Sequence, residues 1–268
     1  YKRQVRNRLM PLEEQVASTD QIPESVISEM RELGLFGLTI PEEYGGLGLN
    51  TEEECKVAIE LGYTSAAFRS VIGTNNGIGS QGLVMDGTDD QKENYLPRLA
   101  SGEIIGSFAL TEPNVGSDSA NVQTKAEKDG DSYILNGTKR WITNANIANL
   151  FTVFARTDQS QKGSSGVSAF LVDANTPGIS LSSKYKKMGQ QGAHVCDVIF
   201  DNCRVPEVNI IGGPNNVNNG FKTAMKTLDR GRIHISAFAV GCAKRLIEIS
   251  TQFSLEREQF GQSISNFQ

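Results

Sequence analysis

Hydrophobic positions in the first hundred residues recur at helical spacing. Val5, Leu9, Leu12 and Val16 follow one another at intervals of four, three and four residues. This spacing places them on one face of a helix. Pro11 lies within the run and predicts a kink, because proline removes a backbone hydrogen bond.

Two further helices are expected before residue 105. One opens at Pro23 and stops at Gly34, since proline suits the first turn of a helix and glycine suits its left-handed C-terminal cap. Thr51 followed by Glu54 is a capping-box pattern for the next helix. Its inner face is expected to carry Cys55, Ala58, Ile59 and Gly62. Residues 1–106 therefore predict an N-terminal α-helical domain.

Between residues 107 and 212 the pattern changes to that of strands. The segment 122–137 holds two strand-like runs around Asp129-Gly130, a pair suited to a tight hairpin turn. Three more short runs are rich in β-branched or aromatic side chains: 150–156, 168–173 and 196–206. Several strands without intervening helices predict an antiparallel β-barrel or sandwich as the middle domain.

Residues 213–268 predict the start of a C-terminal helical bundle. One stripe recurs at alternating spacings of four and three: Phe221, Met225, Leu228, Arg232, Ile235, Ala239, Cys242, Leu246, Ile249 and Phe253. Such a stripe is typical of the seam of a long bundle helix, which needs partner helices to bury it. The expected fold is α+β, with a helical domain, a β domain and an incomplete helical bundle.

Composition excludes several classes of function. The 26 basic and 31 acidic residues are well mixed and give a net charge of −5, so no basic stripe is available for nucleic acid. The four cysteines show no CxxC spacing and there are only two histidines, which argues against a zinc site and fits a reducing compartment. No apolar run approaches the roughly 20 residues of a membrane span. The chain opens on Tyr1, within an expected helix, so we expect it to be trimmed and any targeting peptide to be invisible.

Two residues depart from these patterns. Arg232 is the charged position on the apolar stripe, and it needs either Asp229, three residues earlier on the same face, or a ligand anion or carbonyl. Trp141 is the only tryptophan and lies between two predicted strands. It either packs in a core or rim, or joins Thr143 in presenting an aromatic face and a hydroxyl to a flat ligand.

The stretch ALTEPNVGSDSAN, residues 109–121, is a glycine-containing turn with many hydroxyl groups at the end of a predicted strand. Taken alone, it has two interpretations. Ser117 or Asp118 could bond local backbone in an ordinary turn. The glycine could instead signal phosphate binding, although the stretch matches neither GxGxxG nor a Walker loop.

Four motifs taken together favour a ligand. FALTEPNVGSD (108–118), GTKRWITNA (137–145), LDRGR (228–232) and EREQFGQSISNFQ (256–268) resemble, in order, the signatures of the acyl-CoA dehydrogenase family. The correspondence covers essentially the whole chain. It implies an enzyme that uses FAD to remove two hydrogens across the Cα–Cβ bond of an acyl-CoA thioester. It also implies an electron-transfer flavoprotein as electron acceptor, a homodimer or homotetramer at full length, and a cytoplasmic or mitochondrial-matrix location.

The resemblance assigns roles to individual residues. The FAD site would comprise Phe108, Leu110, Thr111, Gly116, Ser117, Trp141, Ile142 and Thr143. In it, the Thr111 hydroxyl would bond the flavin ring, Trp141 would pack against that ring, and the Thr143 hydroxyl would bond near N5, which receives the hydride. Ser117 would bind the cofactor pyrophosphate or the CoA part of the substrate.

The long helix and its end receive further roles from the resemblance. Asp229 and Arg232 would line the substrate site. Arg257, Phe260 and Gln268 would reach the FAD of a neighbouring subunit.

The family's catalytic base is a glutamate. In most members it lies beyond the position of Gln268, and in a minority it lies on the long helix, where this chain has Arg230-Gly231. Gly231 has no side chain that could accept a proton. We therefore expect no catalytic base within these 268 residues, and no activity from them alone.

Arg69, in AAFRS, resembles the arginine that glutaryl-CoA dehydrogenases use for the distal carboxylate of the substrate. The alternatives are an exposed arginine near a helix end, or an arginine shared with members that act on other acyl chains, and the following VIGTNNGIGSQG departs from the glutaryl pattern. An acyl-CoA oxidase or a flavin-dependent monooxygenase of the same fold is the nearest enzymatic rival. A scaffold that binds flavin or CoA without chemistry is the rival of another class.

Overall fold

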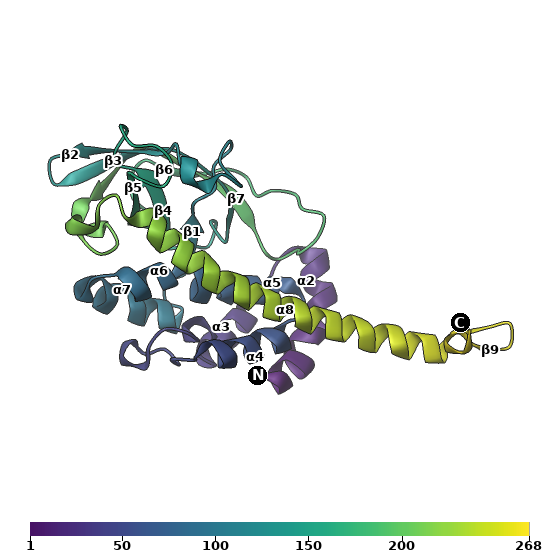
Figure 1. The fold of residues 1–268 in the computed structure, drawn as a ribbon. Coiled ribbons are helices and arrows are strands. Elements are labelled where there is room, and N and C mark those ends of the chain that lie inside the picture. The colour runs from purple at the N-terminus through teal and green to yellow at the C-terminus, as the bar shows by residue number, and fades with distance from the viewer. Residues whose placement is uncertain (268) are drawn as a thin grey trace.

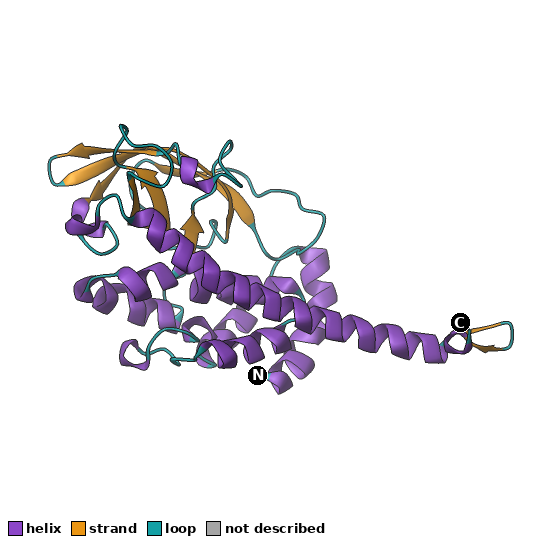
Figure 2. Ribbon diagram, in the orientation of Figure 1, coloured by secondary structure: helices purple, strands orange, loops and turns teal. Residues whose placement is uncertain are grey.

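The protein, described by a computed structural model over residues 1–267, places a layer of helices below a curled sheet, with one long helix running along both (Figures 1 and 2). The first layer contains α1 (Lys2–Gln4), α2 (Glu13–Thr19), α3 (Glu24–Glu32), α4 (Thr51–Leu61), α5 (Ala66–Gly73), α6 (Gln81–Asp86) and α7 (Asp89–Ser101). The long helix is α8 (Gly220–Glu256). The expected α+β fold class is confirmed.

The N-terminal helix is irregular around the proline that predicted a kink. A π-helical turn, Val5–Leu9, and a 3-10 turn, Met10–Leu12, interrupt the α-helical geometry next to Pro11. The following helix also agrees with its sequence signals, since Pro23 is the N-cap of α3 and Gly34 adopts a left-handed φ of 69° just beyond its end.

The capping box of α4 lies one residue earlier than the sequence predicted. The Asn50 side chain accepts from the backbone N–H of Glu53 at 3.1 Å, and the Glu53 carboxylate accepts from the Asn50 N–H at 2.9 Å. Thr51 is therefore the first helical residue and caps nothing. The buried residues of α4 are Glu54, Val57, Ala58 and Leu61, so the expected face was also partly wrong. Asparagine is at least as good an N-cap residue as threonine, and the sequence contains one of each at this point.

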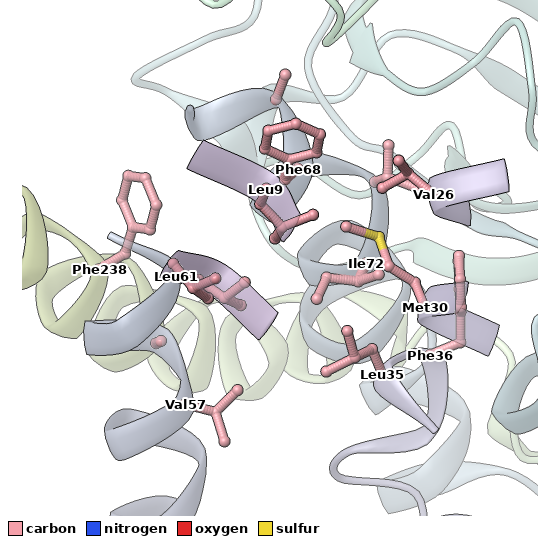
Figure 3. Packing of buried hydrophobic residues seen from close by; sticks show 14 of the residues in the cluster. Leu9, Val26, Met30, Leu35, Phe36, Val57, Leu61, Phe68, Ile72 and Phe238 are labelled. Atoms are coloured by element: carbon pink, nitrogen blue, oxygen red, sulfur yellow. The ribbon is translucent and has the colours of Figure 1, made fainter. Parts of the chain in front are cut away.

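The helical layer is closed by one apolar cluster, shown in Figure 3. Side chains from α3, α4, α5 and the N-terminal turns meet there, and Phe238 of α8 packs against them. The largest fully buried members include Met30, Phe36 and Phe68. Full burial of one side chain of this size stabilises the fold by about 1.5–3 kcal/mol. This cluster therefore holds the first turns of the chain and the middle of α8 in one body.

The middle layer is a mixed sheet built from β1 (Gly106–Ala109), β2 (Lys125–Asp129), β3 (Ser132–Thr143), β4 (Leu150–Arg156), β5 (Val167–Asp173), β6 (Ile179–Leu181) and β7 (Val195–Pro206). Its strand order is β1-β4-β2-β3-β7-β6, with β5 paired to β4. The β2–β3 hairpin turns at Gly130, as predicted. Most pairs are antiparallel, but β4 pairs with β1 and β2 in parallel. A further short pair, β8 (Glu258–Gln259) and β9 (Gln262–Ser263), follows α8.

Helix α8 crosses α4 so closely that both helices need glycine at the contact. A Cβ atom at Gly241 would lie 2.0 Å from the carbonyl oxygen of Ile59, and one at Gly62 would lie 2.3 Å from that of Phe238. The obstructing atoms are backbone atoms, which no rotamer change can move. The two glycines therefore set the distance between α4 and α8.

The face that α8 buries differs from the predicted stripe. Its buried residues are Gly220, Thr223, Ala224, Thr227, His234, Phe238 and Gly241. Positions predicted as the seam, such as Leu246, Ile249 and Phe253, are more than half exposed, at 64%, 52% and 59%. The C-terminal end of α8 projects past the helical layer in Figure 1. Small residues allow the closest helix contact, so the buried face follows glycine and threonine instead of the largest apolar side chains.

No helix among residues 1–267 combines the length and the apolar character needed to cross a membrane.

Candidate cofactor and substrate site

A cavity of about 400 Å³ lies where the end of β1, the bulged end of β3 and α8 meet the turn that follows α5. It is lined by Thr74, Ile78, Phe108, Leu110, Thr111, Gly116, Ser117, Ser119, Trp141, Ile142, Thr143, Leu228 and Arg232. The structure thus brings together the predicted flavin residues from the first two motifs with Arg232 from the third. Its volume is within the range of small-molecule sites.

Trp141 is turned toward the cavity by a bulge in β3. The register against β7 shifts between Lys139 and Ile142, and Trp141 adopts a left-handed φ of 57°. Its backbone N–H donates to Asp197 Oδ1 at 3.3 Å, which holds the bulge in place. Trp141 belongs to β3, so its predicted position between two strands was wrong. Its side chain is 60% exposed, which leaves the ring available for stacking and excludes the core-packing alternative.

Several hydroxyl groups line the cavity without partners in the protein. Within residues 1–267, none of the lining hydroxyl groups makes a side-chain hydrogen bond: Thr74, Thr111, Ser117, Ser119 and Thr143. The Cβ position of Gly116 has no atom within 4 Å, so the turn faces open space there. A flat heteroaromatic ligand with polar edges would use both features, since hydroxyls can donate or accept.

Arg232 and Asp229 form an ion pair on α8, as the first alternative predicted. The pair is exposed, with side chains 66% and 72% accessible. Arg232 also lines the cavity, whereas Asp229 does not appear in its wall. Arg232 therefore has room for a second, ligand-derived partner.

Gly231 is on the side of α8 that faces the cavity wall. A Cβ atom there would lie 3.1 Å from Cγ2 of Ile78, which lines the cavity. Within the described part of the chain, no carboxylate and no histidine contributes to the lining. The cavity as described contains no side chain suited to removing a proton from a carbon acid.

A second cavity, of about 690 Å³, follows the same face of α8 toward its N-terminus. Its α8 side consists of Phe221, Lys222, Met225 and Lys226. The opposite wall is the loop after β4, which includes Ser164 and Ser165. Two lysines, the carboxylate of Asp158 and several hydroxyl or amide groups make this end polar. Lys226 is paired with Asp86 at 2.7 Å, which leaves Lys222 as the lysine without an ion pair among the described residues.

Arg69 lies on α5, one turn before Thr74, with its Nε atom buried and without a hydrogen-bond partner among the described residues. Burial lowers the pKa of Arg69, and the charge of Glu54 partly opposes this effect. The side chain is held over Gly73, where a Cβ atom would lie 2.7 Å from Nε. The alternative of a simply exposed arginine is therefore wrong.

The remaining predicted residues lie far from this cavity. Arg257 is the C-cap of α8, about 38 Å along the helix from Arg232. Phe260 is 96% exposed in the β8–β9 turn. Neither residue can reach the cavity of the same chain. Gln268 lies outside the described residues.

Three residues at the site had no assigned role from the sequence: Glu112, Lys139 and Asp197. Lys139 is fully buried and its Nζ lies 2.7 Å from Oε1 of Glu112, which is only 3% exposed. Asp197 is on β7 and accepts from Arg140 at 3.2 Å as well as from Trp141. A charged residue in an otherwise apolar strand pattern was the available signal for Asp197, whereas Lys139 lies in the polar run GTKR and gave no such signal.

Helices below, a curled sheet above and a cavity against a long helix make this an α+β protein with a site of small-molecule size. Family models for the acyl-CoA dehydrogenase N-terminal, middle and C-terminal domains match residues 1–103, 107–203 and 218–268. The chain therefore belongs to the acyl-CoA dehydrogenase family.

Individual relatives agree. A probable acyl-CoA dehydrogenase of Bacillus subtilis (strain 168), YngJ, is 41% identical over 98% of this chain and 68% of its own length. The structure of butyryl-CoA dehydrogenase from Megasphaera elsdenii is 33% identical, with a TM-score of 0.92 over 98% of this chain and 69% of that chain. A Mycobacterium smegmatis glutaryl-CoA dehydrogenase in complex with FADH2 is 31% identical, with a TM-score of 0.90 over 99% of this chain and 66% of that chain. The chain spans about two thirds of the length of these relatives.

Proposed function

We propose that the chain holds FAD in the cavity beside Trp141 and that the whole protein dehydrogenates an acyl-CoA thioester to the trans-2-enoyl-CoA. The observation that carries this proposal is the row of unpaired hydroxyl groups facing an exposed tryptophan ring. Both fit the polar edge and the flat face of a flavin. When bound, FAD supplies the acceptor for the hydride that leaves Cβ.

The residues around the ring have distinct tasks in this proposal. The hydroxyl of Thr111 and that of Thr143 hydrogen-bond the edge of the ring, and Trp141 covers one face and limits the entry of water. Fixed donors of this kind stabilise negative charge that develops during reaction. Ser117, on the turn with Gly116, binds the pyrophosphate or the CoA part of the substrate.

The substrate is proposed to lie along α8. Its thioester end enters the first cavity beside Leu228 and Arg232, and its phosphate-bearing end lies in the second cavity beside Lys222. Lysine provides a compact positive charge for phosphate. The α-proton passes to a glutamate that is not among the described residues at the cavity. Electrons then pass to an electron-transfer flavoprotein. Arg257 and Phe260 contact the FAD of a neighbouring subunit in the full-length oligomer.

A second candidate concerns the acyl group. The unpaired guanidinium of Arg69, one helical turn before the cavity-lining Thr74, favours a substrate with a distal carboxylate. A buried guanidinium nitrogen without a hydrogen-bond acceptor is unfavourable, and a ligand carboxylate would supply one.

Purified protein that includes the full C-terminal domain tests both parts. It should be yellow, bleach when acyl-CoA is added without oxygen, and reoxidise slowly in air. Rapid release of peroxide would instead favour an oxidase or a monooxygenase. A colourless protein that refuses added FAD would favour the scaffold. Comparing acyl-CoA with an equally long acyl group that ends in a carboxylate tests the role of Arg69.

A further inference from the structure

The loop that carries Thr111, Gly116 and Ser117 is fastened at both of its ends by one buried carboxylate. Glu112, at the start of the loop, accepts hydrogen bonds from the backbone N–H groups of Gln123 and Thr124 at 2.7 and 2.9 Å. The Thr124 hydroxyl also donates to it, at 2.6 Å. The carboxylate thus joins the two ends of the segment 112–124 by hydrogen bonds.

Lys139 joins this closed loop to the strand that carries Trp141. Its ammonium group donates to Glu112 Oε1 at 2.7 Å and to the carbonyl oxygen of Leu110 at 3.1 Å. The next residue, Arg140, donates its backbone N–H to the carbonyl of Thr111 at 2.8 Å. Thr111 is therefore held by the residues on both of its sides and by its own carbonyl.

The close approach of the loop to β3 depends on Gly137. A Cβ atom there would lie 2.6 Å from the Thr124 hydroxyl and 2.8 Å from Cα of Thr124. The pair Glu112 and Lys139 lies behind the cavity wall, since neither residue lines the cavity. Its position supports the wall without occupying the ligand's space.

Stability alone is a poor explanation for this arrangement. Removing two charges from water is unfavourable, and apolar residues of the same size often stabilise a protein more. The buried carboxylate offers something that an apolar pair does not, because it fixes two backbone N–H groups and one ammonium group in defined directions. Burial would raise the pKa of Glu112, but Lys139 and Thr124 hold it below its usual value.

We propose that the buried Glu112–Lys139 pair is a positioning element that fixes the loop 110–124 against β3, so that Thr111 and Ser117 meet the ligand at the same site as Trp141. The flavin part of this inference rests on the proposed function. The loop part concerns the chain itself and is independent of any ligand.

The test compares Glu112→Gln, Lys139→Met and the double variant with Glu54→Gln. Glu54 is a suitable control because it is also buried and bonds His234 at 2.8 Å, in the α4–α8 contact. Hydrogen–deuterium exchange of residues 110–124 is measured in each ligand-free protein, together with FAD affinity and the visible absorption envelope of bound flavin.

Each single variant at the pair should speed exchange in the loop and weaken FAD binding by about tenfold or more, as expected for loss of a charged hydrogen bond. Both should alter the flavin absorption envelope. The double variant should bind FAD no more weakly than the single variant with the lower FAD affinity. Glu54→Gln should change global stability without these effects. Unchanged loop exchange, or faster exchange with unchanged FAD affinity, would overturn the inference. Failure of the unmodified protein to bind FAD would contradict the proposed function, while the exchange comparison would still decide the role of the pair.

Discussion

The side chain of Arg69 occupies the space that Gly73 leaves empty. The Nε atom of Arg69 is 2.7 Å from the position where a Cβ atom of residue 73 would stand, and Cζ is 2.9 Å from it. Side chains on a helix usually lean toward its N-terminus. Arg69 instead leans toward Gly73, and the absence of a side chain on Gly73 permits this direction.

Replacing Arg69 with methionine should make the protein more stable and less selective. Methionine keeps the volume and removes a largely buried charge without a hydrogen-bonded partner, so the unfolding free energy should rise by about 1 kcal/mol. Binding of an acyl-CoA that ends in a carboxylate should weaken, while binding of the plain acyl-CoA should not. Urea unfolding and calorimetric titration measure the two effects. A less stable variant with unchanged selectivity would assign Arg69 a purely structural role.

Gly241→Ala should separate α4 from α8. The added Cβ atom would overlap the carbonyl oxygen of Ile59, which cannot rotate away. Overpacking of this kind destabilises a protein by about 1–3 kcal/mol or more. Gly189→Ala is the matched control, because its Cβ position has no atom within 4 Å. Thermal unfolding of the two variants should differ clearly, and equal midpoints would show that the helices separate without strain.

Trp141→Ala should weaken FAD binding with little effect on folding. The side chain is 60% exposed, so the loss of unfolding free energy should stay within about 0.5 kcal/mol. Loss of stacking on the ring should reduce FAD affinity by about tenfold and change the flavin spectrum. Phe253→Ala removes an aromatic ring of similar exposure, 59%, on the projecting part of α8 and should change neither. An unchanged spectrum in Trp141→Ala would mean that the ring does not contact the flavin.

Gly231→Glu should give the flavin-loaded chain a base. The new side chain would start 3.1 Å from Ile78, which must move by a few tenths of an ångström. Anaerobic addition of acyl-CoA should then bleach the flavin in this variant, but not in the unmodified chain or in Gly231→Ala. Bleaching of the unmodified chain would show that a base is already present among its residues.

The ionisation of Lys139 should appear in the pH dependence of stability. Burial lowers the pKa of Lys139 from 10.5 to about 8, although Glu112 opposes the shift. Between these two values the unfolded chain binds more protons at this position than the folded chain does. The unfolding free energy therefore rises with pH across this window. The unfolding free energy of the unmodified protein, minus that of Lys139→Met, should therefore grow over the same pH range, as measured by urea unfolding. A difference that is independent of pH would show that Lys139 keeps its ordinary pKa.

Local sequence patterns were sufficient to predict the elements whose structure depends only on nearby residues. The strands at 150–156 and 167–173, the hairpin turn at Gly130 and the long helix follow from spacing, turn residues and β-branched content. The motifs around Thr111 and Trp141 also identified the wall of one cavity before the fold was known. Short-range geometry determines such features, so a single sequence contains them.

Only the tertiary structure decided which surfaces meet. The predicted stripe on α8 is largely exposed beyond Arg232, because the α4 contact selects the glycine face around Gly241. The bond between Glu112 and Lys139 joins residues far apart in the chain, and no local pattern announces it. The missing side chain at Gly73 allows the direction that Arg69 takes, and the surrounding helical layer offers its Nε atom no hydrogen-bond partner. The sequence by itself determined the elements, their order and the motif residues. Packing distance and burial, which depend on every neighbour at once, decided how those residues are held.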